Sequence, residues 1–409
     1  MELPERGSSR DDVLTRMRER KAADADWEGG RTWSLVYPAG EDVDDVLRAA
    51  NELYMFENAL NPFRFPSLRS MEEEVCAMTA GMLHAPEGFG GAMTSGGTES
   101  ILMAVKAARD RARAEKGILR PRAVVPYSAH PAFAKACKYL GLELVQVPLG
   151  DDKRADVAAA AKLIDDDTAL VVGSAPNYPF GVVDPIPDLA ALAGERGINF
   201  HTDACLGGFM LPFFEELGEE VPPFDFRVPG VATISADVHK YGYCTKGASV
   251  ITHRTKAHLH QYQLFVYDQW PGGLYGSFAM AGARPAAPIA AAWAVMNFLG
   301  REGYVGLARE VRDTTRKLRE GIEAIPELTV WADPVMSVMS FGSEKIDIAA
   351  VGDVMDERGW HLDRQNDPGA LHMMVSPAHA KVADAFLADL REAVAHHGTS
   401  KGALARYSS

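Results

Sequence analysis

The sequence is poor in the features that mark several common classes of protein. Its four cysteines are scattered and form no CxxC pair, which is typical of reduced thiols in a cytoplasmic protein. No long basic run accompanies the net charge of −14, so no nucleic-acid partner is expected. The longest apolar stretch, residues 286–299, contains Pro288 and is too short to span a membrane. Residues 1–30 have no apolar core that could serve as a secretory signal. These absences predict a cytoplasmic protein without an integral membrane segment.

Two kinds of catalytic chemistry also lack support. No cluster of histidine, cysteine and acidic residues has metal-ligand spacing, so no metal is expected. No GxSxG motif accompanies a serine–histidine–aspartate set, which argues against a serine hydrolase. The composition, with 409 residues of which 47% are hydrophobic and 24% charged, is ordinary for a globular enzyme with more than one domain.

From residue 94 onward, helical and strand-like patterns alternate along the chain. The strands are short apolar runs of the kind buried on both faces, which predicts an α/β fold with a mostly parallel sheet covered by helices. The expected strands are residues 123–126, 143–147, 169–173, 199–202, 232–235 and 248–252. The expected helices are residues 98–116, 129–140, 155–164 and 186–195.

The flanking regions are expected to be helical at the start and mixed at the end. The helices there are residues 10–23, 42–57, 68–84, 288–299 and 303–324, with a loop-rich segment at 254–283. After Pro326 the order strand, strand, helix, strand, helix predicts a small domain, with elements at 328–331, 335–342, 348–358, 370–375 and 379–395. We therefore expect an N-terminal helical segment (1–60), a large α/β domain (61–300) and a small C-terminal α/β domain (301–409).

A lysine occupies an unusual position at the end of an apolar strand-like run. Lys240 follows residues 230–234 within the stretch SADVHKYGY. It either reaches solvent or supplies an amine that, when desolvated, attacks a carbonyl to form a Schiff base. Upstream, Asp203 ends another strand and a glycine pair precedes a helix. A phosphate cradle, an acid and an amine are the protein groups that bind pyridoxal 5′-phosphate, so we expect that cofactor.

The cradle and the acid each have an ordinary structural alternative. The residues Ser95-Gly96-Gly97-Thr98 can form a simple turn with a helix cap, although glycine amides at a helix N-terminus are suited to an anion. Asp203 can cap the turn that follows it. A protonated ring nitrogen would instead provide the partner that a buried carboxylate needs.

Three further cations could serve the same site. His130 at the start of a helix either lies at the surface or stacks on the cofactor ring as an acid or base. His239, beside the lysine, could hydrogen-bond the cofactor phosphate. Lys246 is either an exposed turn residue or the anchor for an anionic group of the substrate.

Several long stretches, in order, resemble the sphingosine-1-phosphate lyase family, in the group II decarboxylase-like branch of fold-type I pyridoxal-phosphate enzymes. The resemblance covers roughly residues 55–395. The matching stretches are residues 94–104 (TSGGTESILMA), 128–130 (SAH), 201–209 (HTDACLGGF), 224–231 (FDFRVPGV) and 235–243 (SADVHKYGY).

The resemblance implies a seven-stranded sheet, a homodimer with a shared active site, and specific residue roles. Lys240 would bind the cofactor covalently, Asp203 would pair with its ring nitrogen and His130 would lie over the ring, as the catalytic set. The other implied cofactor contacts are Ser95, Gly96, Gly97, Thr98, His201, Ser235, His239, Gly273 and Ser277. The implied substrate contacts are Lys246, Asn61, Tyr241 and Tyr243. The loop around Gly273 and Ser277 would come partly from the neighbouring subunit.

The chain departs from the family pattern at the substrate-facing edge. Residues 58–63 read NALNPF where the family often has Asn-Pro-Leu-His-Pro-Asp, and Phe180 replaces a usual histidine. No membrane anchor like that of eukaryotic members is expected. The reaction class is therefore better supported than the substrate.

The resemblance implies retro-aldol cleavage of a phosphorylated long-chain 2-amino-3-hydroxy base into an aldehyde and phosphoethanolamine. The base that takes the hydroxyl proton could be His130, Tyr241, Tyr243 or the substrate phosphate. One alternative is an amino-acid decarboxylase with the same cofactor, which would release carbon dioxide. A cofactor-binding protein without catalysis is a third hypothesis, and the chain offers no appended recognition domain to favour it.

Overall fold

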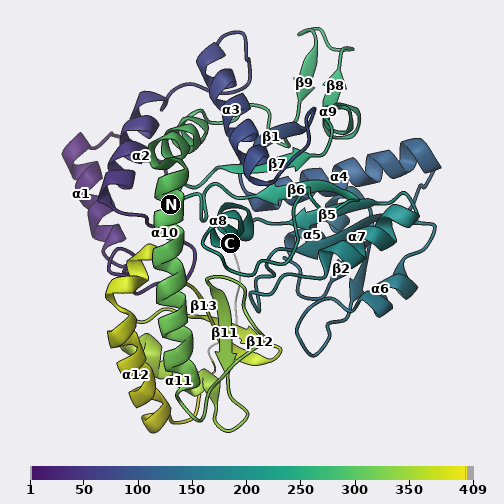
Figure 1. Cartoon of the computed structure of the whole chain (residues 1–409). Helices are drawn as coiled ribbons and strands as arrows, with labels where there is room; N and C mark the ends of the chain where they lie inside the picture. The colour runs from purple at the N-terminus through teal and green to yellow at the C-terminus, as the bar shows by residue number, and fades with distance from the viewer. Residues whose placement is uncertain (1, 401, 403–409) are drawn as a thin grey trace.

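The computed structural model describes residues 2–400 and 402, and its centre is a seven-stranded sheet (Figure 1). The strand order is β1-β7-β6-β5-β4-β2-β3, in which β2 to β6 run parallel and β7 runs antiparallel to both of its neighbours. The strands are β1 (Gly90–Thr94), β2 (Arg122–Pro126), β3 (Glu143–Val147), β4 (Thr168–Ser174), β5 (Asn199–Asp203), β6 (Val231–Ala236) and β7 (Ser249–His253). The predicted α/β fold with a mostly parallel sheet is confirmed.

The sheet is buried on both faces because its strands alternate between two apolar clusters. Val124 and Val171 pack into the larger cluster, whereas Val125 and Val172 pack into a cluster with helix α4. The helices around this sheet are α2 (Glu41–Leu53), α3 (Pro66–Met82), α4 (Gly97–Lys116), α5 (Ala132–Leu140), α6 (Val157–Leu163), α7 (Ile186–Glu195) and α8 (Leu211–Glu216), with a short η1 (Gly207–Phe209). A further helix, α1 (Arg10–Lys21), contributes no buried residue.

A second sheet lies toward the C-terminus and has its own apolar cluster. It is antiparallel, in the order β10-β11-β13-β12. Its elements are β10 (Thr329–Val330), β11 (Val338–Gly342), α11 (Ile348–Glu357), β12 (Asp363–Asn366), β13 (Gly369–Met374), η3 (Pro377–Lys381) and α12 (Ala383–His396). Trp33 from the N-terminal segment is fully buried in this cluster, where its ring stacks on His379 at 4.1 Å. The predicted pattern of the C-terminal region is confirmed, with β12 as an additional strand.

One long helix joins the two sheets (Figure 1). Helix α10 (Ala287–Glu323) is interrupted at Gly300, which has a φ of 56°, a left-handed conformation that favours glycine. The two predicted helices at 288–299 and 303–324 therefore meet end to end. The division of the chain into three parts at residues 60 and 300 stays a prediction.

The segment expected to be loop-rich contains regular structure. After α9 (Lys256–His258) and the π-helix η2 (Leu259–Gln263), a hairpin of β8 (Phe265–Tyr267) and β9 (Tyr275–Ser277) protrudes from the molecule (Figure 1). The sequence analysis also missed β1 and α8. Over residues 2–400 and 402, no helix combines the length and the apolar character needed to cross a membrane.

Candidate active site

A cavity of about 280 Å³ opens at the carboxyl ends of the parallel strands. Ligands of such sheets bind at this edge because the strand ends and the following loops meet there. Its lining comes from the loop before α4, the ends of β4 and β5, and the segment after β6. The lining residues are Ser95, Gly96, Gly97, Thr98, Glu99, Ile101, His130, Ser174, Pro176, Tyr178, Asp203, Cys205, Leu206, Asp237, His239 and Lys240.

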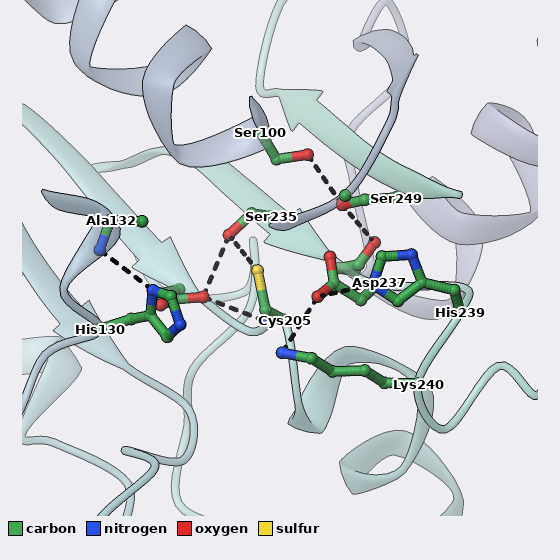
Figure 2. A network of polar contacts seen from close by, with 12 residues as sticks. Ser100, His130, Ala132, Cys205, Ser235, Asp237, His239, Lys240 and Ser249 are labelled. Atoms are coloured by element: carbon green, nitrogen blue, oxygen red, sulfur yellow. Dashed lines mark hydrogen bonds and ion pairs between the residues drawn. The ribbon is translucent and has the colours of Figure 1, made fainter. Parts of the chain in front are cut away.

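Lys240 reaches the cavity from the turn that follows β6. Its Nζ lies 3.1 Å from Oδ2 of Asp237, a carboxylate that is almost fully buried (Figure 2). The backbone amide of Lys240 donates to the carbonyl of Asp237 at 3.2 Å, which fixes the turn. The lysine therefore faces the cavity with a buried anion beside its amine, and does not extend freely into solvent.

Asp203 lies in a row with Ser174 and Ser235 across three neighbouring strands, because these residues are register partners in β4, β5 and β6. Its Oδ1 accepts hydrogen bonds from the amide of Cys205 at 3.1 Å and from the hydroxyl of Ser235 at 3.2 Å. Those two donors hold the carboxylate in place while it lines the cavity. Asp203 thus fits a role as the partner of a cationic ring nitrogen.

The glycine pair makes room for groups from two other segments. A Cβ atom on Gly97 would lie 2.7 Å from Oδ2 of Asp237 and 2.8 Å from Sγ of Cys205. A Cβ atom on Gly96, whose φ is 156°, would lie 3.0 Å from the ring of His239. Only glycine allows this approach, and the adjoining α4 N-terminus offers its free amides to an anion.

His130 lines the cavity just before α5. Its Nδ1 accepts a hydrogen bond from the amide of Ala132 at 3.1 Å, so the neutral ring carries its proton on Nε2 (Figure 2). Burial lowers the pKa of His130, and the charge of Lys240 lowers it further. The ring is therefore neutral at pH 7 and able to stack on a flat cofactor.

His239 is held against the glycine loop by its backbone neighbours. Its Nδ1 accepts from the amides of Gly247 and Ala248, which directs the protonated Nε2 toward Oδ2 of Asp237 at 3.7 Å. Burial lowers the pKa of His239 to about 4.

Lys246 does not line the cavity but lies directly behind it. Although part of its side chain is exposed, its amine turns inward and donates to the carbonyl of His239 at 3.1 Å, over the ring of Tyr37. Loss of solvent around the amine, followed by the charge of Lys240, lowers the pKa of Lys246 to about 8.

Four residues expected to contact the cofactor or the substrate lie elsewhere. His201 and Ser235 are fully buried behind the cavity, where His201 Nε2 lies 3.2 Å from the Ser235 hydroxyl. Tyr241 and Tyr243 are core residues, and Tyr241 donates its hydroxyl to the carbonyl of Val375. None of these four lines the cavity, because packing in the core and between strands sets their side-chain directions, and their contact with cofactor or substrate stays a prediction.

Asn61, Gly273 and Ser277 also lie outside this cavity. Asn61 and Ser277 line a separate hollow of about 530 Å³ between α3, the loop before it and the β8–β9 hairpin. Gly273 is at the exposed hairpin tip. For Gly273 and Ser277 this arrangement is compatible with the expected contribution to a neighbouring subunit. That contribution, and the substrate contact expected of Asn61, stay predictions.

The structure adds residues that the sequence analysis did not single out for the site. Tyr178 follows β4 and its hydroxyl donates to Asp363 of the second sheet at 2.8 Å, while His372 stacks on its ring. Glu99 accepts from the amide of Ser95 and from that of Met280, which ties the glycine loop to residues 278–281. Asp237 is the third addition. Asp237 could have been found from the sequence, because it follows a predicted strand and precedes the lysine by three residues.

The cavity suits pyridoxal 5′-phosphate by its own chemistry. It contains an amine on Lys240, a fixed carboxylate on Asp203 and an amide-lined cradle at Gly96 and Gly97. In addition, the Ser174 hydroxyl is buried and has no hydrogen-bond partner within the described part of the chain, so it is available to a bound polar group.

Fold and site together define a pyridoxal-dependent enzyme, and comparison with known proteins agrees. The pyridoxal-dependent decarboxylase conserved domain matches residues 37–344. The sphingosine-1-phosphate lyase of Arabidopsis thaliana is 42% identical over 96% of this chain and 74% of its own length, and that of Rattus norvegicus is 42% identical over 96% and 69%. The chain belongs to the sphingosine-1-phosphate lyase family of pyridoxal-phosphate-dependent lyases.

Three further similarities bear on the fold and on the reaction. The structure of sphingosine-1-phosphate lyase from Burkholderia pseudomallei superimposes with a TM-score of 0.94 at 41% identity, covering 97% of this chain and 93% of that one. An L-aspartate decarboxylase of Thermococcus kodakarensis is 35% identical over 95% of this chain and 98% of its own length. A likeness to Lactobacillus brevis glutamate decarboxylase, with a TM-score of 0.84 at 20% identity, supports the fold alone.

Proposed function

We propose that this enzyme cleaves a phosphorylated sphingoid base, a long-chain 2-amino-3-hydroxy phosphate, into a long-chain aldehyde and phosphoethanolamine. The observation that carries the proposal is the similarity of nearly the whole chain to sphingosine-1-phosphate lyases of plants and animals, at 42% identity. The cofactor, when bound, supplies an electron sink for the carbon that loses its bond.

The residues of the cavity support defined roles in this reaction. Lys240 would hold the cofactor covalently, Asp203 would keep its ring nitrogen protonated, and the cradle of Gly96, Gly97 and Thr98 would bind its phosphate together with His239. His130 would lie over the ring as a neutral imidazole, and to act as a base it would have to take the proton at Nδ1 in place of its hydrogen bond from the amide of Ala132. We do not propose Tyr241 or Tyr243 as that base, because burial raises the pKa of both hydroxyls and neither lines the cavity.

Lys246 supports the assignment of a phosphorylated substrate. Its amine lies behind the cavity wall on the carbonyl of His239, and a turn of this long side chain would bring it toward an anionic group of a bound substrate. With its pKa lowered to about 8, Lys246 is still mostly protonated at neutral pH.

Amino-acid decarboxylation is the second candidate, because the Thermococcus L-aspartate decarboxylase is 35% identical and nearly equal in length. The two functions are separated by offering the cofactor-loaded enzyme a phosphorylated sphingoid base and, separately, L-aspartate. We expect a long-chain aldehyde and phosphoethanolamine from the first and no carbon dioxide from the second. Carbon dioxide from L-aspartate without aldehyde from the sphingoid base would overturn the proposal.

We further propose a cytoplasmic homodimer whose subunits complete each other's active sites. Exposed apolar side chains on the loop before α3 and on the hairpin support this, among them Phe56, Phe63, Trp270 and Leu274. The four cysteines, all buried and unbonded, support a reducing compartment. Mixing inactive Lys240→Ala subunits with subunits whose hairpin residues 270–276 are deleted should restore part of the activity, which a monomer could not do.

A further inference from the structure

Asp237 is a buried carboxylate in the cavity wall to which no role has been given above. Its side chain is only 1% exposed, yet it lies beside two basic side chains of its own segment, Lys240 and His239. Lys240 Nζ is 3.1 Å from its Oδ2, and His239 Nε2 is 3.7 Å from the same atom. In Figure 2 a dashed line joins the lysine amine to this carboxylate.

The surrounding chain leaves Asp237 little freedom to move. A Cβ atom on Gly97 would lie 2.7 Å from Oδ2 and 3.0 Å from Oδ1, so the start of α4 is packed directly against the carboxylate. Because a buried anion is costly unless it is paired, the site retains Asp237 only together with a cation. The nearest cation is the Lys240 amine.

The electrostatics of the neighbours agree with this pairing. Burial alone would raise the pKa of Asp237, but the charge of Lys240 and then that of His239 bring it below its ordinary value. Four other titratable groups interact with the charge of Lys240, namely His130, Cys205, Tyr241 and Lys246. Three more line the same cavity, namely Glu99 of α4, Tyr178 and Asp203 at the end of β5.

We propose that Asp237 is a positioning residue that holds the cofactor-free amine of Lys240 as an ammonium ion and so sets the pH at which this amine becomes reactive. The inference rests on the proposed function in one respect, that Lys240 is the lysine that binds the cofactor. Its consequence is that Asp237 controls how readily the apoprotein captures an aldehyde at neutral pH, because only the neutral amine is nucleophilic.

The test uses the full-length protein without cofactor. The rate at which acetic anhydride labels Lys240 is followed from pH 6 to pH 11 by mass spectrometry of the lysine-containing peptide. Asp237→Asn should move the midpoint of this profile down by about 1–3 pH units, as expected when a carboxylate in contact is neutralised. At neutral pH that shift corresponds to labelling, and to capture of pyridoxal phosphate, at least about tenfold faster.

A matched control makes the same chemical change at a distant, equally buried aspartate. Asp225 is also 1% exposed and pairs with Arg227 rather than with a residue of the cavity. Asp225→Asn should leave the Lys240 profile unchanged. A profile that is the same in Asp237→Asn as in the unaltered protein would overturn the inference.

A second measurement covers the case in which Asp237→Asn is too unstable to label. Lys240→Met removes the cation and leaves the buried carboxylate of Asp237 unpaired, so the melting temperature of this variant should fall. In the double variant with Asp237→Asn, the melting temperature should rise again. Equal melting temperatures for Lys240→Met with and without Asp237→Asn would contradict the pairing. Neither readout requires catalysis, so attachment of the cofactor to another lysine would refute the proposed function without affecting them.

Discussion

At the scale of single residues, position 97 requires glycine because a side chain does not fit there. A Cβ atom at this position would lie only 2.7 Å from Oδ2 of Asp237 and 2.8 Å from Sγ of Cys205. Both groups are buried and cannot retreat without moving strand ends. The glycine therefore belongs to the geometry of the cavity rather than to the flexibility of the loop.

We expect Gly97→Ala to weaken cofactor binding. Overpacking of this kind costs roughly 1–3 kcal/mol, or about one to two powers of ten in Kd if the strain falls on the cradle. Fluorescence titration of the apoprotein with pyridoxal phosphate measures it. Gly194→Ala, on helix α7 where an added Cβ meets nothing within 4 Å, is the control and should leave Kd unchanged.

Single residues also show how much of the site can be predicted from local sequence. Lys240, Asp203, His130 and the glycine pair were predicted to lie together, because strand ends and a helix N-terminus meet at one edge of a parallel sheet. Tyr178 could not be found in this way, since its position depends on Asp363 and His372 from a different sheet. Contacts between distant segments carry no local sequence signal.

At the scale of elements, the segment between the hairpin and α10 is fixed by one ion pair. Arg284 places two nitrogens against the two carboxylate oxygens of Glu72 on α3, at 2.6 and 2.8 Å, and both side chains are 19% exposed. Glu72 also accepts from the amide of Met93 in β1. The pair therefore joins α3, β1 and the segment that follows the hairpin.

Glu72→Gln should destabilise the protein by roughly 3 kcal/mol, because it leaves a largely buried guanidinium without its carboxylate. Urea unfolding at a fixed protein concentration measures the change. Glu73→Gln, one residue further on the same helix, removes only the Arg69 pair, whose side chains are 55% and 64% exposed. That control should change stability by less than about 0.5 kcal/mol, and equal effects of the two substitutions would contradict the account.

Among the elements, most helices and the parallel strands were predicted well, α8 (Leu211–Glu216) being missed, and the missed strands share a cause. Strand β1 begins with Gly90-Gly91 and pairs antiparallel with β7, so neither its composition nor its place in the chain order indicates a strand. The β8–β9 hairpin is two three-residue strands with exposed side chains. Both depend on pairing partners rather than on local apolar pattern.

At the scale of the whole molecule, buried neutral histidines shape the response to acid. Burial lowers the pKa of His201, His239, His372 and His379 to about 4, and that of His253 to about 3. An unfolded histidine titrates near 6.5. Between about pH 6.5 and pH 4 the unfolded chain therefore binds more protons than the folded one, and the free energy of unfolding falls as the pH falls.

The contribution of one histidine, His379, to this pH dependence can be measured by a single substitution. In His379→Gln the amide can replace both hydrogen bonds of the ring, from the amide of Ser376 and to the carbonyl of Thr32. The slope of unfolding free energy against pH between 4.5 and 6 should fall by up to about 1.4 kcal/mol per pH unit. The exposed His396 changed to Gln should leave the slope as it was, and a parallel curve for His379→Gln would contradict the assignment.

The central claim is that the amine at position 240 binds the cofactor. Loading the protein with pyridoxal phosphate, reducing with sodium borohydride and sequencing the peptides by mass spectrometry tests it most directly. The account predicts one phosphopyridoxyl group per chain, on Lys240, and none after Lys240→Ala. A group found on Lys246 or on any other lysine, or a protein left unlabelled, would contradict it.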